Sequence, residues 1–281
     1  ANQAVAAARL GGSVTFITSL GNDMYADILK KHFKKEGITT DYIIDDVNHP
    51  TGTALIFVAN SGENCIAVAP GANYSLLPGS IAHFSEVIDA ADIIVLQAEI
   101  PYETNKNIAL LARQKGKKVL FNPAPACLID EELMKAINIL VVNELEAAFI
   151  SGIEYTGDNL ENIAQTLMET GACNVVITLG SQGVYMKNPK ETIQLPGYKV
   201  NTIDTIAAGD TFCGALAVIC AQKEIDQEAL NFANAAAAIA VTRSGAQPSI
   251  PTLDEVKHFI LKNESTLLNL INHEELSETP L

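Results

Sequence analysis

The stretch "DTIAAGDTFCGAL", residues 204–216, combines two aspartates with small residues and an apolar run. The apolar positions have helical spacing, and Ala208-Gly209-Asp210 is predicted to form the first turn of the helix. No bulky side chain would mask the N–H groups of that turn. Because those groups carry the positive end of the helix dipole, they form a ready anion site. The stretch therefore predicts an anion hole with a carboxylate beside it.

Asp210 is a candidate general base at this site. A carboxylate there can accept the proton of a hydroxyl group while the N–H groups stabilise charge on a transferred phosphoryl group. The alternative interpretation, an aspartate that caps the helix, is very common. That alternative leaves the preceding small residues and the second carboxylate, Asp204, unexplained. The sequence therefore favours the catalytic interpretation.

Other catalytic classes have little support in this sequence. The five histidines, at positions 32, 49, 83, 258 and 273, lie outside every glycine-rich junction. A Ser–His or Cys–His nucleophile therefore has no evident candidate, which weakens hydrolase hypotheses. The pattern GxxxxGK[ST] does not occur, which excludes a conventional P-loop.

The rest of the chain predicts an α/β fold. Apolar strand-like runs alternate with helix-like segments from residue 91 to residue 187, as in a parallel sheet covered on both faces. Two further strand-like runs, 52–60 and 64–72, predict an antiparallel hairpin. We therefore expect a doubly wound, mostly parallel sheet with helices on both faces and a small antiparallel β lid at about 51–73. Ligands bind such sheets at the carboxyl ends of the strands.

Composition narrows the choice of partners. The 281 residues suit one large domain, predicted as 1–263 with a polar tail at 264–281. The 18 Lys and Arg against 33 Asp and Glu give a net charge of −15, which disfavours nucleic acid and anionic membrane surfaces. The five cysteines form no CxxC pair, which indicates reduced thiols in a cytoplasmic protein. No apolar stretch reaches membrane-spanning length.

Two motifs at predicted strand ends have good structural explanations. "FNPAPA", residues 121–126, reads as a rigid extended turn. In "VVNELEAA", Asn143 and Glu146 are three residues apart at a strand–helix junction, which favours a capping box. The functional alternative is a polar pair directed at a magnesium-bound phosphate or its water shell.

A third motif, "VVITLGSQG", ends a predicted strand with hydroxyl groups and glycines. Thr178, Gly180, Ser181 and Gly183 could let the backbone approach a nucleotide and donate hydrogen bonds to phosphate. A plain hairpin turn has the same composition, and the sequence supports both interpretations equally.

Together these motifs resemble those of the ribokinase-like family of sugar kinases. "DTIAAGDTFCGAL" resembles the family's signature, and "FNPAPA", "NELEA", "ITLGSQGV" and "AAAAIAVTRSGAQPSIP" resemble further segments in the same order. "ANQAVAAARLGG" resembles the end of its N-terminal sugar-binding motif. The similarity extends from residue 1 to about residue 260. It implies ATP-dependent phosphorylation of D-ribose at the 5-hydroxyl by a homodimer joined through the lid.

The resemblance also implies roles for residues at matching positions. The catalytic group would be Asp210 with an anion hole formed by Ala207, Ala208 and Gly209. The sugar contacts would be Asn2, Glu99 and Asp210. The nucleotide site would contain Asn143, Thr178, Leu179, Gly180, Ser181, Gln182, Gly183, Gly209, Asp210 and Asn234. Glu146 would lie near the magnesium shell. A potassium ion would be bound by Asp204, Ile206, Ala240, Arg243, Gly245 and Ser249.

The sequence departs from the family pattern at two places. Cys213 replaces an asparagine one turn into the predicted helix, where we expect little consequence. Ala1 lies inside the sugar-binding motif, so a fragment limited to residues 1–281 is expected to bind nucleotide with little ribose kinase activity. Two alternatives remain: a kinase for deoxyribose, fructose or a nucleoside, and a catalytically silent binding protein if the preceding segment is truly absent.

Overall fold

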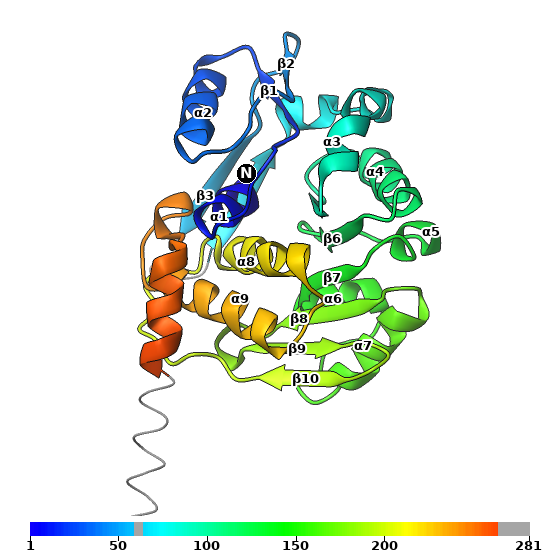
Figure 1. The fold of residues 1–281 in the computed structure, drawn as a ribbon, viewed down its shortest axis with the longest axis vertical. Coiled ribbons are helices and arrows are strands. Elements are labelled where there is room, and N and C mark those ends of the chain that lie inside the picture. The colour runs from blue at the N-terminus through cyan, green and yellow to red at the C-terminus, as the bar shows by residue number, and fades with distance from the viewer. Residues whose placement is uncertain (59–63, 264–281) are drawn as a thin grey trace, which may run out of the picture.

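The computed structural model describes residues 1–58 and 64–263, and its centre is a six-stranded sheet (Figure 1). The strands are β5 (Ile93–Gln97), β6 (Lys118–Asn122), β7 (Ile139–Asn143), β8 (Asn174–Thr178), β9 (Val184–Lys187) and β10 (Thr192–Leu195). They lie side by side in the order β10-β9-β8-β7-β6-β5. The pairs from β5 to β8 are parallel, whereas β9 and β10 are antiparallel to their neighbours. The predicted, mostly parallel sheet is confirmed.

Helices cover both faces of this sheet. They are α4 (Tyr102–Gln114), α5 (Glu131–Met134), α6 (Glu144–Ser151) and α7 (Leu160–Glu169) on one face, and α8 (Ala208–Gln222) and α9 (Gln227–Ala240) on the other. Alternate strand residues point to opposite sides, so Leu140 packs in the first layer and Val141 in the second. Both side chains are almost fully buried, which contributes roughly 1.5–3 kcal/mol each.

The N-terminal part forms two smaller sheets. Its elements are α1 (Asn2–Arg9), β1 (Thr18–Gly21), α2 (Met24–Lys35), β2 (Ile43–Asp46), β3 (Thr53–Val58) and β4 (Asn64–Ala69). β1 pairs with β2 in parallel. β3 and β4 pair antiparallel, as the hairpin pattern predicts. The turn of that hairpin lies outside the described residues.

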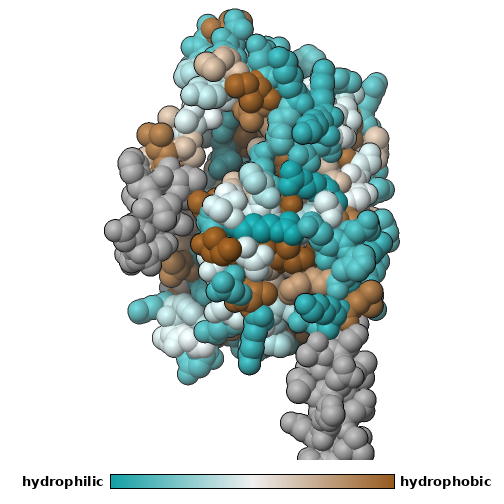
Figure 2. Space-filling model, turned by 90° about the vertical axis from the view of Figure 1, so that its left-hand side faces the viewer, coloured by the Kyte–Doolittle hydropathy of each residue, from teal (hydrophilic) through white to brown (hydrophobic). Residues whose placement is uncertain are grey.

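Shorter elements complete the chain. They are the 3₁₀ helices η1 (Gly71–Ser75), η2 (Pro78–Phe84), η3 (Gly180–Gln182) and η4 (Gln247–Ser249), the helix α3 (Ser85–Ala90), and a helix over 253–263. The predicted tail, 264–281, falls outside the described residues. Within 1–58 and 64–263, no helix is both long and apolar enough to cross a membrane. On the face in Figure 2, hydrophobic side chains form small separate groups among hydrophilic ones.

Helix α1 crosses α8 at very short range, and the two lie side by side in Figure 1. The crossing point on α8 is Gly214. A Cβ atom built there would lie 2.6 Å from the Ala6 Cβ, 2.8 Å from the Gln3 carbonyl oxygen and 2.9 Å from the Ala7 nitrogen. Two of these atoms belong to the α1 backbone, which cannot move aside alone. Only glycine therefore permits this approach.

Replacing Gly214 by alanine is expected to destabilise the protein. Alanine in a free helix would gain about 1 kcal/mol over glycine. At this crossing we expect a net loss of about 1–3 kcal/mol, because overpacking pushes the helices apart. Urea unfolding of Gly214→Ala measures this. Gly209→Ala is the matched control in the same helix, since its added Cβ would meet no atom within 4 Å. A Gly214→Ala protein as stable as the unmodified one would show that the crossing is not tight.

Candidate active site

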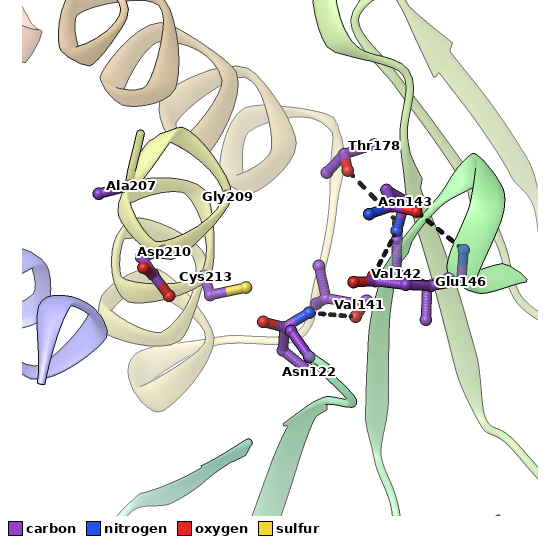
Figure 3. Close-up of a pocket in the computed structure, with 11 residues that line it drawn as sticks. Asn122, Val141, Val142, Asn143, Glu146, Thr178, Ala207, Gly209, Asp210 and Cys213 are labelled. Carbon is purple, nitrogen blue, oxygen red and sulfur yellow. Dashed lines mark hydrogen bonds between the residues drawn. The ribbon is translucent and has the colours of Figure 1, made fainter. Parts of the chain in front are cut away.

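A cavity of about 210 Å³ opens between the N-terminus of α8 and the carboxyl ends of β6, β7 and β8 (Figure 3). Side chains from α8 and from the sheet face each other across it. The lining residues are Asn122, Ala124, Val141, Val142, Asn143, Glu146, Thr178, Ala207, Gly209, Asp210 and Cys213. The cavity therefore lies at the strand ends, where the sequence predicts a ligand site.

The N-terminus of α8 has an unusual backbone. Ala207 is the N-cap residue, with φ 60° and ψ 12°, and it is the one non-glycine residue of positive φ in the described part of the chain. The left-handed conformation costs a residue with a Cβ about 1–2 kcal/mol. No described side chain caps this terminus. Asp210 is the third residue of the helix, so the N-cap interpretation of Asp210 is wrong.

The Asp210 carboxylate is held by two side chains of α1. The Asn2 Nδ2 donates to its Oδ2 at 2.9 Å, and the Gln3 Nε2 donates to its Oδ1 at 3.1 Å. Asn2 in turn accepts a hydrogen bond from the Gln247 Nε2 at 3.3 Å. The structure thus brings together Asn2 and Asp210, which the resemblance assigns to the sugar and to catalysis.

The sequence analysis missed two residues at this place. Gln3 is buried and also donates to the Asn122 Oδ1 at 3.0 Å, although it stands beside Asn2 in the sequence. Asn122 lines the cavity and donates to the Val141 carbonyl oxygen at 2.9 Å. Its motif was interpreted as a rigid turn only. The position of Asn122 at the end of a predicted strand could have indicated a site residue. Nothing in the sequence indicated the long-range hydrogen bonds of Gln3.

The opposite wall contains the predicted capping box at the start of α6. The Glu146 N–H donates to the Asn143 Oδ1, and the Asn143 N–H donates to the Glu146 Oε2, both at 2.8 Å. The capping interpretation is confirmed, and the same two residues also line the cavity. Burial raises the pKa of Glu146 above its usual value, and the N–H of Asn143 opposes that shift.

Cys213 also faces this space. It was expected to have little consequence, yet it lines the cavity one helical turn after Asp210. Burial raises the pKa of its thiol well above the usual value, and the nearby Asp210 charge adds to the shift. The position thus presents an un-ionised thiol where the family pattern has an amide.

The segment 178–183 forms the turn of the β8–β9 hairpin. Thr178 lines the cavity, whereas Leu179 is buried. A Cβ on Gly183, which has φ 103°, would lie 2.1 Å from the Leu195 carbonyl oxygen. The β10 end therefore requires this glycine, and the hairpin interpretation accounts for it.

Glu99 and Asn234 are among the predicted site residues that do not line the cavity. Glu99 is exposed in the turn that follows β5. Asn234 is buried in α9, and its Nδ2 donates to the Pro196 carbonyl oxygen at 2.9 Å. In this structure the Asn234 side chain secures the segment that approaches Gly183.

The second carboxylate, Asp204, connects two loops. Its Oδ1 accepts the Ile206 N–H and its Oδ2 accepts the Gly245 N–H, both at 2.9 Å. These donors lower the pKa of Asp204. Ser249 is buried, and its Oγ donates to the Ala246 carbonyl oxygen at 2.6 Å. Asp204 therefore joins the loops that contain Ile206 and Gly245, while Ala240 ends α9 and Ser249 ends η4.

Chemically, these loops offer carbonyl, hydroxyl and carboxylate oxygens, the donors that hard cations prefer. Among residues 1–58 and 64–263, no three His, Cys, Asp or Glu side chains gather in a group that could hold a metal ion.

Replacing Asp204 by alanine is expected to loosen both loops, because the N–H groups of Ile206 and Gly245 lose their acceptor. Hydrogen exchange measures this directly, and those two amides should lose protection. Asp226→Ala is the control, since its carboxylate caps α9 through the Ala229 N–H at 2.8 Å. That variant should affect the start of α9 and the contact with Lys223, and leave the amides of Ile206 and Gly245 unchanged. Unchanged exchange at Ile206 and Gly245 in Asp204→Ala would contradict this role.

Comparison with known proteins adds independent findings. Residues 1–253 match the model of the pfkB family of carbohydrate kinases. The ribokinase of Haemophilus influenzae is 40% identical over 261 residues, which cover 92% of this chain and 85% of that protein. The structure of Thermotoga maritima ribokinase matches with a TM-score of 0.82 and 41% identity, over 92% of this chain and 85% of that one. Arabidopsis thaliana ribokinase, solved with ribose and ATP, matches with a TM-score of 0.85 and 30% identity over the same shares.

Proposed function

The chain belongs to the pfkB family of carbohydrate kinases, and we propose that it transfers the γ-phosphoryl group of ATP to the 5-hydroxyl of D-ribose. The observation that carries this proposal is the Asp210 carboxylate at an uncapped helix N-terminus that opens into a cavity. The ribokinases of Haemophilus influenzae and Thermotoga maritima, at 40% and 41% identity, support ribose as the substrate. The products are D-ribose 5-phosphate and ADP.

The chemical step follows from the position of Asp210. Its carboxylate accepts the proton of the sugar hydroxyl while the hydroxyl oxygen forms a bond to the γ-phosphorus. The bond between that phosphorus and the bridging oxygen of ATP breaks, and ADP leaves. The N–H groups at the N-terminus of α8 stabilise the negative charge that develops on the transferred group. Ala207, Ala208 and Gly209 suit this task because they place no large side chain in the way.

Sugar and nucleotide would occupy opposite sides of Asp210. Asn2 already bonds to Asp210, and Glu99 follows the strand that leads toward this region. On the nucleotide side, Asn143 and Thr178 line the cavity. The other predicted nucleotide contacts are Leu179, Gly180, Ser181, Gln182, Gly183 and Asn234.

The residues present fit the two metal ions that the resemblance implies. Glu146 offers a carboxylate in the cavity wall and would hold magnesium through its water shell. Bound magnesium would neutralise phosphate charge. The potassium ligands would be Asp204, Ile206, Ala240, Arg243, Gly245 and Ser249. Asp204 already joins the loops of Ile206 and Gly245, and Ile206 directly precedes the N-cap residue of α8.

We also propose that the β3–β4 hairpin covers the sugar and joins two subunits. Leu55 and Val68 are paired with Ala67 and Ala54 respectively, so they occupy opposite faces of the hairpin. Both are more than half exposed, at 59% and 57%. A sheet with apolar side chains on both faces can contact substrate on one face and a partner on the other.

A comparison of sugars tests the proposed function. An assay that couples ADP release to a measured signal should give the highest kcat/KM for D-ribose, above deoxyribose, fructose and a nucleoside. The full-length protein is the sample for this assay. Preference for another sugar would exclude ribose and retain the kinase class, whereas no turnover with any of them would contradict both.

Replacing Asp210 by asparagine should abolish phosphoryl transfer and leave ATP binding nearly unchanged. General-base help contributes typically ~10²–10⁴-fold, and an amide cannot accept the hydroxyl proton. Turnover and ATP affinity, measured on the same preparation, check this expectation. A variant that retained a tenth of normal turnover would exclude Asp210 as the base.

Potassium should raise activity well above that in sodium. A large cation bound at the loops that Asp204 joins would order the anion hole without contacting the substrate. The measurement is turnover in potassium, sodium and tetramethylammonium buffers of equal ionic strength. Ser249→Ala should weaken the potassium effect, because it removes one oxygen ligand. Equal rates in all three buffers would show that no such site acts.

A further inference from the structure

A chain of three amide side chains, of which Gln3 and Asn122 are buried and Gln97 is partly buried, crosses the space between the sheet and the helices that carry Asn2 and Asp210. The Gln97 Nε2 donates to the Gln3 Oε1 at 2.7 Å, and the Gln3 Nε2 donates to the Asn122 Oδ1 at 3.0 Å. The Asn122 Nδ2 then donates to the Val141 carbonyl oxygen at 2.9 Å. The residues come from β5, α1, β6 and β7, so the chain connects three strands with the N-terminal helix.

The direction of these hydrogen bonds is fixed from one end. The Val141 carbonyl group can only accept, so Asn122 must turn its NH₂ group toward it. The Asn122 oxygen then faces Gln3, which must present its own NH₂ group. The Gln3 oxygen therefore points away and is occupied by the Gln97 NH₂ group. Gln3 is 5% exposed and Asn122 is 9% exposed, so water does not readily replace these partners.

The Gln3 NH₂ group fixed in this way also bonds to the Asp210 Oδ1 at 3.1 Å. The other oxygen, Oδ2, is held by Asn2, which is only partly buried. The Asn2 amide is itself loosely held, with a 3.3 Å bond from Gln247. One oxygen of the carboxylate therefore has a rigid, buried donor, and the other has a donor that an incoming hydroxyl group can replace.

We propose that Gln3 is a positioning residue that holds the Asp210 carboxylate through Oδ1 and so directs Oδ2 toward the hydroxyl group of the sugar. This proposal rests on the proposed kinase function, and it assigns Gln3 no contact with either substrate. It follows that loss of the Gln3 NH₂ group lets the carboxylate rotate. Binding of sugar and ATP persists, while the fraction of bound complexes with a correctly placed base falls.

Gln3→Met tests the proposal, since methionine has nearly the shape of glutamine and cannot donate to Asp210. A misplacement of about 1 Å at a catalytic group can cost on the order of 10²-fold. We expect kcat to fall about 10- to 100-fold, with KM for ribose and for ATP within about twofold. Gln97→Met should act in the same direction more weakly, because the Gln3 amide keeps its donors but loses the group that fixes its oxygen.

Thr104→Val is the matched control for the loss of a buried hydrogen bond. Thr104 is fully buried and donates to the Leu76 carbonyl oxygen at 2.7 Å, and it has no part in the amide chain. We expect it to lower thermal stability as much as Gln3→Met does, with kcat unchanged. Equal kcat losses in the two variants, or a kcat in Gln3→Met within twofold of the unmodified protein, would overturn the proposal.

A second measurement separates this proposal from the proposed function. Crystal structures of the unmodified protein and of Gln3→Met show the rotamer of Asp210 whether or not a sugar is turned over. We expect one rotamer in the first and a changed or mixed rotamer in the second. An identical, single Asp210 rotamer in both structures would overturn the positioning role. Failure of the unmodified protein to phosphorylate any sugar would instead contradict the kinase function.

Discussion

The close crossing of α1 and α8 at Gly214 is the constraint on which the site depends. Asn2 and Gln3 are 208 and 207 positions from Asp210 in sequence, and they reach it only because no Cβ separates the two helix backbones. Residues of the same α8 helix pack on the sheet through Phe212 and Leu216. One helix thereby links the hydrophobic core on one side with the polar contacts of the carboxylate on the other.

The sequence predicted those parts of the structure that depend on local patterns. Alternating strands and helices give the layered sheet, and the spacing of Asn143 and Glu146 gives a capping box that the structure contains. The start of α8 at Ala208 likewise follows from the run of small residues. The capping box and the helix start are each determined by a few neighbouring residues, and each strand or helix of the sheet is indicated by the pattern within its own segment.

Features that depend on long-range contacts were beyond the sequence. Gln3 bonds to Asn122 and Asp210, and nothing near Gln3 indicates either partner. The close approach of the β10 end to Gly183 likewise had no local indication in the sequence. We expected little consequence from Cys213 because the sequence predicts its position in the helix but not the direction in which its side chain points. In the structure the Cys213 side chain points to the cavity, so its thiol forms part of the cavity wall.

The capping box at the cavity wall has a thermodynamic consequence. The Glu146 Oε2 is the acceptor for the N–H of Asn143, so the same atom that a ligand could recruit also completes the end of α6. A ligand that took this oxygen would leave the Asn143 N–H without its acceptor. The loss costs about 1 kcal/mol, which reduces the free energy of ligand binding by the same amount. Folding and ligand binding are therefore linked functions at this wall, and a substitution that strengthens one is expected to weaken the other.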